Sequence, residues 1–231
     1  MAPSPPLTIV FQNPHLVGAD KPAGLLTVPS RIGASDPRPC LGRVLEEQLG
    51  QRLWPVHRLD VEVSGLVLFA RSAEAHRTAS VAFEARRVKK SYQAITEGAA
   101  SLSELPASFT WQSRLFRGKR RTFEAPHGRM AVTHAVAQAR VHIGGEDFLV
   151  FDLEPETGRS HQLRVHLAKA GFPILGDALY GARAGYDEPG AIALRSVRLA
   201  FTDDRERQTL GIPGPLEVSP LPILATTRHI P

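Results

Sequence analysis

The sequence predicts a mixed α+β fold, because strand-like and helix-like segments interleave irregularly and several strand-like segments are adjacent. The stretch 108–152 reads mostly as strand and turn, with period-two alternation over 131–137 and an apolar run over 148–153. No Gly-rich phosphate loop is present, which argues against a doubly wound nucleotide-binding sheet and against a nucleotide cofactor.

Three helices are expected. The first is marked by apolar residues at helical spacing and stops at Gly50; these residues are Leu41, Val44, Leu45 and Leu49. The second covers about 73–86 behind the capping residue Ser72, with an inward face of Ala75, Ala79, Ala82 and Phe83. The third runs for about ten residues from the cap Ser160 to Gly171.

Strands are expected over 7–17, broken at Asn13-Pro14, and over 64–70, 91–97 and 192–201. The segment 19–29 mixes turn signals with apolar pairs, 30–40 reads as a loop, and the residues from Pro213 onward are weakly patterned. We see no repeat and no long linker, so we expect one domain over 8–222 with loose tails at 1–7 and 223–231.

The composition excludes several protein classes. A chain of 231 residues can bury a self-sufficient core. It contains no apolar run of membrane-spanning length, and its first residues lack the pattern of a secretory signal. Cys40 is the single cysteine, which excludes an internal disulfide and a metal site built on several thiolates. We therefore expect a cytoplasmic protein.

The net charge is +5, and ten of the Lys and Arg residues lie in two clusters. One consists of Arg86, Arg87, Lys89 and Lys90, and the other of Arg114, Arg117, Lys119, Arg120, Arg121 and Arg129. Clustered Lys and Arg favour a surface that follows a phosphate backbone. A solvated basic face is the alternative, and the cations of 117–121 are also typical of a hairpin edge protected from strand addition.

Three polar segments carry the candidate chemistry: His57-Arg58-Leu59-Asp60, Lys89-Lys90-Ser91-Tyr92, and Thr157-Gly158-Arg159-Ser160-His161-Gln162-Leu163-Arg164, which runs on to Gly176-Asp177-Ala178-Leu179-Tyr180-Gly181. Asp60 stands between Leu59 and Val61 at the mouth of an apolar strand. A carboxylate there must be paired or open to a ligand, because an unpaired buried charge is costly. We interpret Asp60 as a nucleophile. The third segment opens a helix, where Arg159 and His161 would favour an anion.

These segments, preceded by Asp20-Lys21-Pro22-Ala23-Gly24-Leu25-Leu26-Thr27-Val28-Pro29, resemble the RluA family of RNA pseudouridine synthases over roughly residues 8–202. The resemblance implies the pseudouridine synthase catalytic fold, a central mixed and mostly antiparallel sheet flanked by helices with a cleft across it. The chain looks like those members that lack the small N-terminal RNA-binding domain.

The resemblance also implies residue roles. Asp60 corresponds to the catalytic aspartate, Tyr92 to the tyrosine that stacks on the target base and helps remove its carbon-5 proton, and Arg164 to the arginine that pairs with the aspartate. Arg58 matches a residue that displaces the target base. Further RNA contacts are expected at His57, Lys89, Lys90, Arg159, His161, Arg117 and Arg120.

The implied reaction moves the glycosidic bond of a uridine from nitrogen to carbon 5 in structured RNA, either rRNA or tRNA. It is redox-neutral and adds no atoms, so no cofactor and no metal are expected. One domain with a basic groove can act as a monomer.

Alternatives exist for each residue. Asp60 could cap a turn, Arg164 could be a surface helix residue, and Tyr92 could be a core tyrosine. His161 and His166 do not share a helix face, which argues against a metal site. The sequence departs from the family pattern at Val63, Arg195 and Asp204. The competing functions are a catalytically inactive RNA-binding or RNA-chaperone module, and a glycoside or nucleoside hydrolase, which usually needs two carboxylates.

Overall fold

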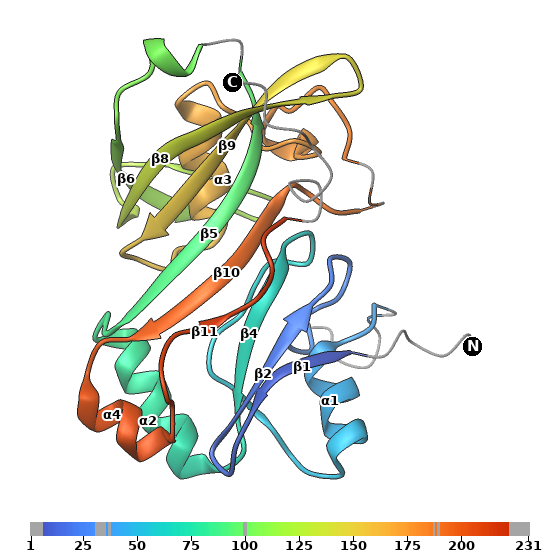
Figure 1. The fold of residues 1–231 in the computed structure, drawn as a ribbon, viewed down its shortest axis with the longest axis vertical. Helices are drawn as coiled ribbons and strands as arrows, with labels where there is room; N and C mark the ends of the chain where they lie inside the picture. Colours follow the sequence, from blue (N-terminus) through green and yellow to red (C-terminus); the bar gives the residue numbers. More distant parts are fainter. Residues whose placement is uncertain are drawn as a thin grey trace. The chain divides into compact units, whose positions relative to one another are not determined.

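The computed structural model describes residues 7–30, 36, 38–98, 101–186, 188 and 190–221. The chain forms two compact units (Figure 1). The first comprises the described parts of Met1–Val88 together with Arg198–Val218, and the second those of Lys89–Val197 and Ser219–Pro231. The extent of one domain over 8–222 stays a prediction. Both predicted tails, apart from Leu7, lie outside the described residues, as do positions 31–35 and 37 of the predicted loop.

The first unit contains a small antiparallel sheet. Strand β2 (Leu16–Lys21) pairs with β1 (Thr8–Gln12) on one side and with β4 (Ser64–Ala70) on the other. The short β3 (Trp54–Pro55) pairs with β4, and β11 (Leu216–Glu217) pairs with residues Arg198 and Leu199 of β10 (Leu194–Phe201). The β1 and β2 strands confirm the expected break at Asn13-Pro14.

Helices α1 (Leu41–Leu49), α2 (Ala73–Glu84) and α4 (Asp204–Leu210) belong to the first unit. Gly50 ends α1 in the left-handed region at φ 62°, and the Ser72 side chain accepts a hydrogen bond from the Ala75 amide at the start of α2. Both were predicted. The α2 face of Ala75, Ala79 and Ala82 packs into a core with apolar residues of β2, β4 and β10. Burial of this face stabilises α2, because a helix of this length gains most of its stability from packing against the rest of the protein.

The second unit contains a larger antiparallel sheet. Its strands lie in the order β5 (Val88–Glu97), β9 (Glu146–Pro155), β8 (Arg129–Ile143), β6 (Phe109–Arg117) and β7 (Thr122–Glu124). The β8–β9 hairpin turns at Gly144 and Gly145, whose φ angles of 60° and 89° suit glycine. The two short 3-10 turns of this unit cover Leu102–Glu104 and Ala178–Tyr180. Helix α3 (Gln162–Lys169) packs against β7 and β8. Sheets and helices in both units confirm the predicted α+β class.

The predicted cap at Ser160 is wrong. Helix α3 begins at Gln162, and its N-cap is His161 in the left-handed region at φ 52° with no side-chain cap. The Gln162 side chain closes the preceding turn instead, because its Oε1 accepts from the Thr157 hydroxyl at 2.6 Å and from the Arg159 amide at 3.1 Å. Gly171, with φ 89°, follows the end of α3 as predicted.

Two departures from the family pattern have a structural account. Asp203 caps α4, a helix that was not predicted, by accepting a hydrogen bond from the Glu206 amide, and Asp204 is the first residue of that helix. Arg195 is buried, and its Nε donates to the Ser219 carbonyl at 2.7 Å. Val63, the third departure, is a buried apolar residue. No helix within the described ranges has the length and apolar character needed to cross a membrane.

Gly128 provides a test of the second unit's packing. An added Cβ would lie 2.7 Å from the backbone carbons of Arg114 and Leu115, closer than real contacts allow. Gly128→Ala should therefore force β6 and β8 apart and lower the free energy of unfolding by about 2–4 kcal/mol. Urea unfolding measures this change. Gly185→Ala is the matched control, since no atom lies within 4 Å of the Cβ that this substitution adds. Equal midpoints for the two variants would contradict the predicted clash.

Candidate active site

The Asp60 loop lies in the first unit, between β3 and β4. His57 anchors its start: its Nε2 accepts a hydrogen bond from the Leu68 amide of β4 at 3.1 Å, and its ring stacks on Phe83 with centroids 5.0 Å apart. Arg58 is exposed, whereas Leu59 is buried and Asp60 is half-buried. The RNA contact expected of His57 stays a prediction, and what the structure shows is that its ring holds this loop in place.

Hydrogen bonds fix the backbone on both sides of Asp60. On one side, the Thr27 hydroxyl donates to the Leu59 carbonyl at 3.0 Å and accepts from the Leu59 amide at 3.1 Å. On the other side, the Val61 carbonyl accepts from the Gly24 amide at 2.8 Å and from Lys21 Nζ at 3.2 Å. The carboxylate is therefore carried by a backbone that has little freedom to move.

Lys21 is an unusual component of this arrangement, because its side chain is fully buried. A buried ammonium is tolerated only when its donors are satisfied. Its Nζ donates at 2.9 Å to the Pro22 and Leu25 carbonyls, besides the bond to Val61. Lys21 and Thr27 belong to the motif 20–29, but no role was predicted for either of them. The available signal was their position among turn residues, since Lys21 directly precedes Pro22 and Thr27 lies between Gly24 and Pro29.

Tyr92 lies in the second unit on β5, where it pairs with Leu153 of β9 and is half-buried. Lys89 is exposed. Lys90 Nζ donates to the Thr157 carbonyl at 3.0 Å, which ties β5 to the loop before α3. The second and third polar segments of the sequence therefore meet within this unit.

Arg164 is buried, which rules out the alternative of a surface helix residue. It forms a bidentate ion pair with Asp177, with Nε–Oδ2 at 2.7 Å and Nη2–Oδ1 at 2.8 Å. Its guanidinium also lies over the Tyr180 ring at 5.1 Å from the centroid. Asp177 was not predicted as a site residue, and the pairing of Arg164 with Asp60, which belongs to the other unit, stays a prediction.

A hydrogen-bonded chain connects two predicted RNA contacts. Arg117 Nη1 donates to His161 Nε2 at 2.8 Å, and His161 Nδ1 lies 2.9 Å from the Tyr180 hydroxyl. Because Nε2 accepts from a guanidinium, a neutral His161 carries its proton on Nδ1 and donates to Tyr180. The Tyr180 hydroxyl in turn donates to the Thr122 carbonyl, and burial is the main cause that raises its pKa. Arg120 is exposed, and its carbonyl accepts a hydrogen bond from Arg117 Nη1 at 3.5 Å.

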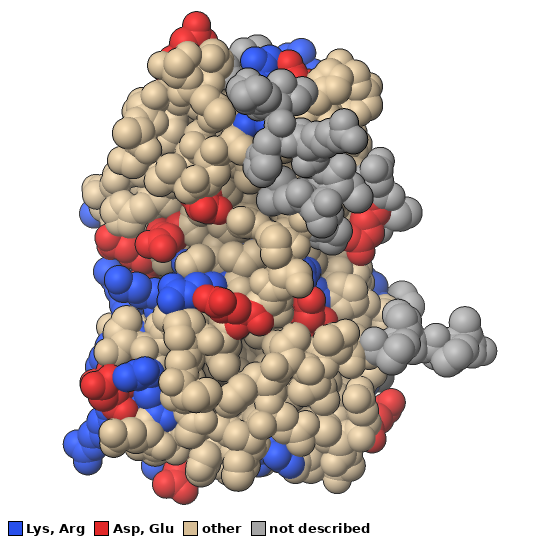
Figure 2. Space-filling model, viewed as in Figure 1, with Lys and Arg blue, Asp and Glu red and all other residues tan. Residues whose placement is uncertain are grey.

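Fewer Lys and Arg side chains are available to bind RNA than the sequence contains, because several of them are engaged with other groups of the protein. Figure 2 shows Lys and Arg side chains interspersed with Asp and Glu side chains on one face. Arg87 pairs with Glu206 at 2.5 Å in the first unit, and Lys169 pairs with Glu124 in the second. Arg159 Nε donates to the Met130 carbonyl at 3.0 Å. Within the described ranges, no three His, Cys, Asp or Glu side chains lie close enough together to bind a metal ion.

The profile of the RNA pseudouridylate synthase family matches residues 15–169, a range that contains Asp60, Tyr92 and Arg164. The chain belongs to this family. A curated relative, the dual-specificity RNA pseudouridine synthase RluA of Vibrio vulnificus, is 32% identical over 207 residues, which cover 87% of this chain and 80% of the relative. The resemblance to the RluA family is thereby confirmed.

A further sequence relative and a solved structure are also similar to this chain. The tRNA pseudouridine synthase C of Yersinia pestis is 31% identical over 192 residues, covering 76% of this chain and 70% of the relative. The solved structure of human RNA Pseudouridylate Synthase Domain Containing 1 superposes with a TM-score of 0.77 at 23% identity, over all of this chain and 93% of that one. The predicted catalytic fold is confirmed by this likeness. The chain is accordingly an isomerase of the pseudouridine synthase class.

Thr27 tests whether the fixed backbone around Asp60 matters for the reaction. Thr27→Val keeps the side-chain shape but loses the hydroxyl that bonds both polar groups of Leu59. We expect kcat for pseudouridine formation to fall roughly 10- to 100-fold with little change in KM, because the carboxylate is mispositioned. Thr27→Ser keeps the hydroxyl and should retain most of the activity. A Thr27→Val enzyme with the kcat of the wild type would show that these hydrogen bonds have no catalytic role.

His166 gives the fold a predicted dependence on pH. It is buried, its ring nitrogens lie 3.0 Å from the Ser113 hydroxyl and 2.9 Å from the Thr133 hydroxyl, and burial lowers its pKa from 6.5 to about 4. Below pH 6.5 the unfolded chain binds a proton at this position that the folded chain does not bind until about pH 4. As the pH drops from 6.5 to about 4, the free energy of unfolding should therefore decrease, by on the order of 1–2 kcal/mol.

Urea unfolding of the wild type and of His166→Gln between pH 7 and pH 4 measures the effect. The variant should show a flatter dependence of the unfolding free energy on pH. His15→Gln, at an exposed position, controls for the loss of a histidine as such. Parallel pH curves for wild type and His166→Gln would refute the assignment.

Proposed function

We propose that this chain converts particular uridines of structured RNA to pseudouridine, with Asp60 as the nucleophile, Tyr92 as the base platform and Arg164 as the counter-ion of Asp60. The observation that carries the proposal is the Asp60 loop, which belongs to the family's motif and has its backbone fixed on both sides by Thr27, Gly24 and Lys21. A nucleophile held in this way loses little freedom when the substrate binds.

The reaction requires a group that adds to the substrate and then leaves. The bond between the anomeric carbon and uracil nitrogen 1 breaks, and a bond from the same carbon to uracil carbon 5 forms. Carbon 5 loses one proton and nitrogen 1 gains one, so the atoms balance without a redox step. An ionised carboxylate suits this role, because it can attack either the anomeric carbon or the base ring and depart again.

Tyr92 and Arg164 support the remaining steps. Moving the target base out of its stack costs a few kcal/mol, and stacking of the base on an aromatic ring such as Tyr92 offsets about 1–3 kcal/mol of this cost. The bidentate bond to Asp177 fixes the plane of the Arg164 guanidinium, which favours a defined orientation toward a carboxylate. Asp177 is then a positioning residue that acts through Arg164.

The substrate is proposed to be a transfer or ribosomal RNA. Relatives named for tRNA and for dual specificity support this range. Exposed cations on both units, among them Arg58, Lys89 and Arg120, are available for the RNA backbone. We further propose that the enzyme acts in the cytoplasm as a monomer. Mapping pseudouridines in total RNA from cells with and without this protein identifies the modified positions.

Asp60→Asn tests the proposed nucleophile. RNA labelled with tritium at uracil carbon 5 should lose its label with the wild-type enzyme, and the variant should release at least about 1,000-fold less, because an amide is a far weaker nucleophile. The variant should still bind RNA. Glu62→Gln is the matched control, since it removes a carboxylate from the same loop, two residues away.

The products decide between the competing functions. Full label release by Asp60→Asn would end the proposal for this residue. RNA binding by the wild type without release from any cellular RNA would favour an inactive binding module. Free uracil among the products would favour a hydrolase.

A further inference from the structure

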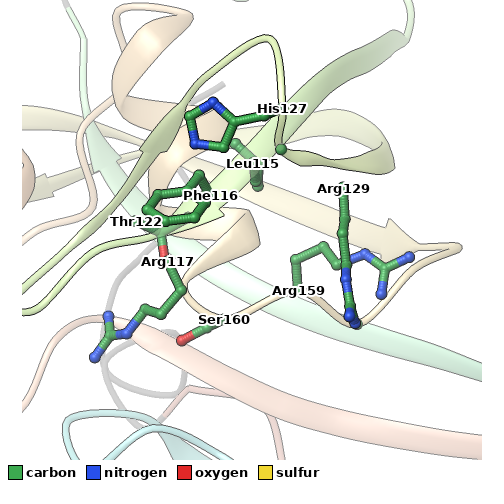
Figure 3. A pocket seen from close by; sticks show the side chains of 10 residues that line it. Leu115, Phe116, Arg117, Thr122, His127, Arg129, Arg159 and Ser160 are labelled. Carbon is green, nitrogen blue, oxygen red and sulfur yellow. The ribbon is translucent and has the colours of Figure 1, made fainter.

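The second unit contains a pocket that is lined by none of the proposed catalytic residues. It has a volume of about 420 Å³ and is bordered by the end of β6, the start of β8 and the loop before α3 (Figure 3). Its lining residues are Leu115, Phe116, Arg117, Thr122, His127, Gly128, Arg129, Gly158, Arg159 and Ser160, and we call it the Arg129 pocket. Neither Tyr92 nor Arg164 lines it.

The Arg129 pocket is strongly cationic. Three guanidinium groups and an imidazole line it, and no carboxylate does. In Figure 3 the Arg129 and Arg159 side chains lie next to each other on one side of the pocket. Two like charges at close range repel each other, and a bound anion removes this repulsion.

Arg129 is the residue of this group whose charge is most available. Arg117 donates to His161, and Arg159 donates to the Met130 carbonyl. Arg129 is exposed, and within the described ranges its guanidinium makes no ion pair or hydrogen bond. Arginine binds phosphate with a planar set of donors, so a phosphate is the anion that this geometry suits best.

Aromatic rings line the opposite side of the pocket. Phe116 is 40% exposed and lies edge-to-face with His127 at 4.6 Å and with Phe123 at 5.7 Å between ring centroids. Exposed aromatic side chains next to cations are typical of surfaces on which bases of single-stranded RNA stack. The β6 backbone approaches Gly128 so closely that no side chain fits there, and this glycine is part of the pocket lining.

We propose that the Arg129 pocket binds one nucleotide of the RNA substrate other than the uridine that is isomerised. Arg129 and Arg159 contact its phosphate, and its base packs against Phe116 and His127. The volume of about 420 Å³ falls within the range of small-ligand sites, roughly 300–1,000 Å³, and suffices for one nucleotide. This inference rests on the proposed function, and it adds a subsite for an unpaired nucleotide whose base is free to stack.

Three variants test the Arg129 pocket. Arg129→Ala removes the available guanidinium, Phe116→Ala removes the ring, and Phe116→Tyr keeps it. The matched control is Arg121→Ala, because Arg121 is an exposed arginine of the neighbouring turn that does not line the pocket. Bulk tRNA and bulk rRNA from the source cells serve as separate probes in filter binding at several salt concentrations.

Arg129→Ala should weaken RNA binding about 5- to 10-fold and reduce the slope of log K against log salt by about 1. Phe116→Ala should weaken binding about 5- to 100-fold with an unchanged slope, since stacking is not an ionic contact. Phe116→Tyr should bind like the wild type, and Arg121→Ala should show a smaller loss than Arg129→Ala. Ultraviolet cross-linking followed by peptide mass spectrometry should place base adducts on Phe116 or His127.

Tritium release by the wild type separates the two proposals. If label is released and both Arg129→Ala and Phe116→Ala bind RNA as well as Arg121→Ala does, the pocket proposal is overturned while the proposed function stands. If no label is released from either RNA, the proposed function fails, and the same binding measurements still decide whether the pocket holds RNA. A wild-type protein that binds neither RNA overturns both.

Discussion

The fixed backbone around Asp60 is the constraint on which the proposed chemistry depends. A carboxylate on a mobile loop would lose conformational freedom whenever it attacked a substrate, and that loss would add to the barrier. The protein avoids this cost by burying the Lys21 ammonium beneath the loop, where it meets the carbonyls of Pro22, Leu25 and Val61. A neutral side chain of the same length could not donate to three carbonyls at once. The buried charge is therefore retained for geometry rather than for net stability.

In the second unit a buried ion also holds a functional group in place, but here the buried ion is the Asp177 carboxylate and the group that it orients is the Arg164 guanidinium. Arg164 and Asp177 form a bidentate pair in which both side chains are almost completely buried. Desolvation offsets much of the attraction in such a pair, so its contribution to stability is small, whereas the loss of either partner would leave an uncompensated buried charge. What the pair provides is a guanidinium with a fixed plane. In both units a buried ion orients a group that the proposed reaction uses.

Local patterns in the sequence predicted much of the fold and less of the site. The spacing of Leu41, Val44, Leu45 and Leu49 and the cap at Ser72 identified α1 and α2, because helix periodicity and capping depend on neighbours in the chain. The cap rule failed at Ser160 because a side chain within the helix, Gln162, satisfied the turn that precedes it. Contacts between distant residues were beyond such rules. The bond of Thr27 to Leu59 spans 32 positions, and that of Lys21 to Val61 spans 40, and neither has a local periodic signature. The resemblance to a family indicated which residues to propose as reactive without indicating what holds them. This is also why Asp177 was missed as the partner of Arg164.

The distribution of charge shows why a count of basic residues overstates the capacity to bind RNA. Arg87 is neutralised by Glu206, Lys90 holds a loop carbonyl, and Arg117 holds His161. Part of the donor capacity of each of these cations is already used within the protein, so fewer donors remain for a phosphate. Among the described residues the Arg129 guanidinium donates no hydrogen bond, so all of its donors remain available. We therefore expect affinity for RNA to be concentrated at the few positions where, as in the Arg129 pocket, an available charge and an exposed ring line the same cavity.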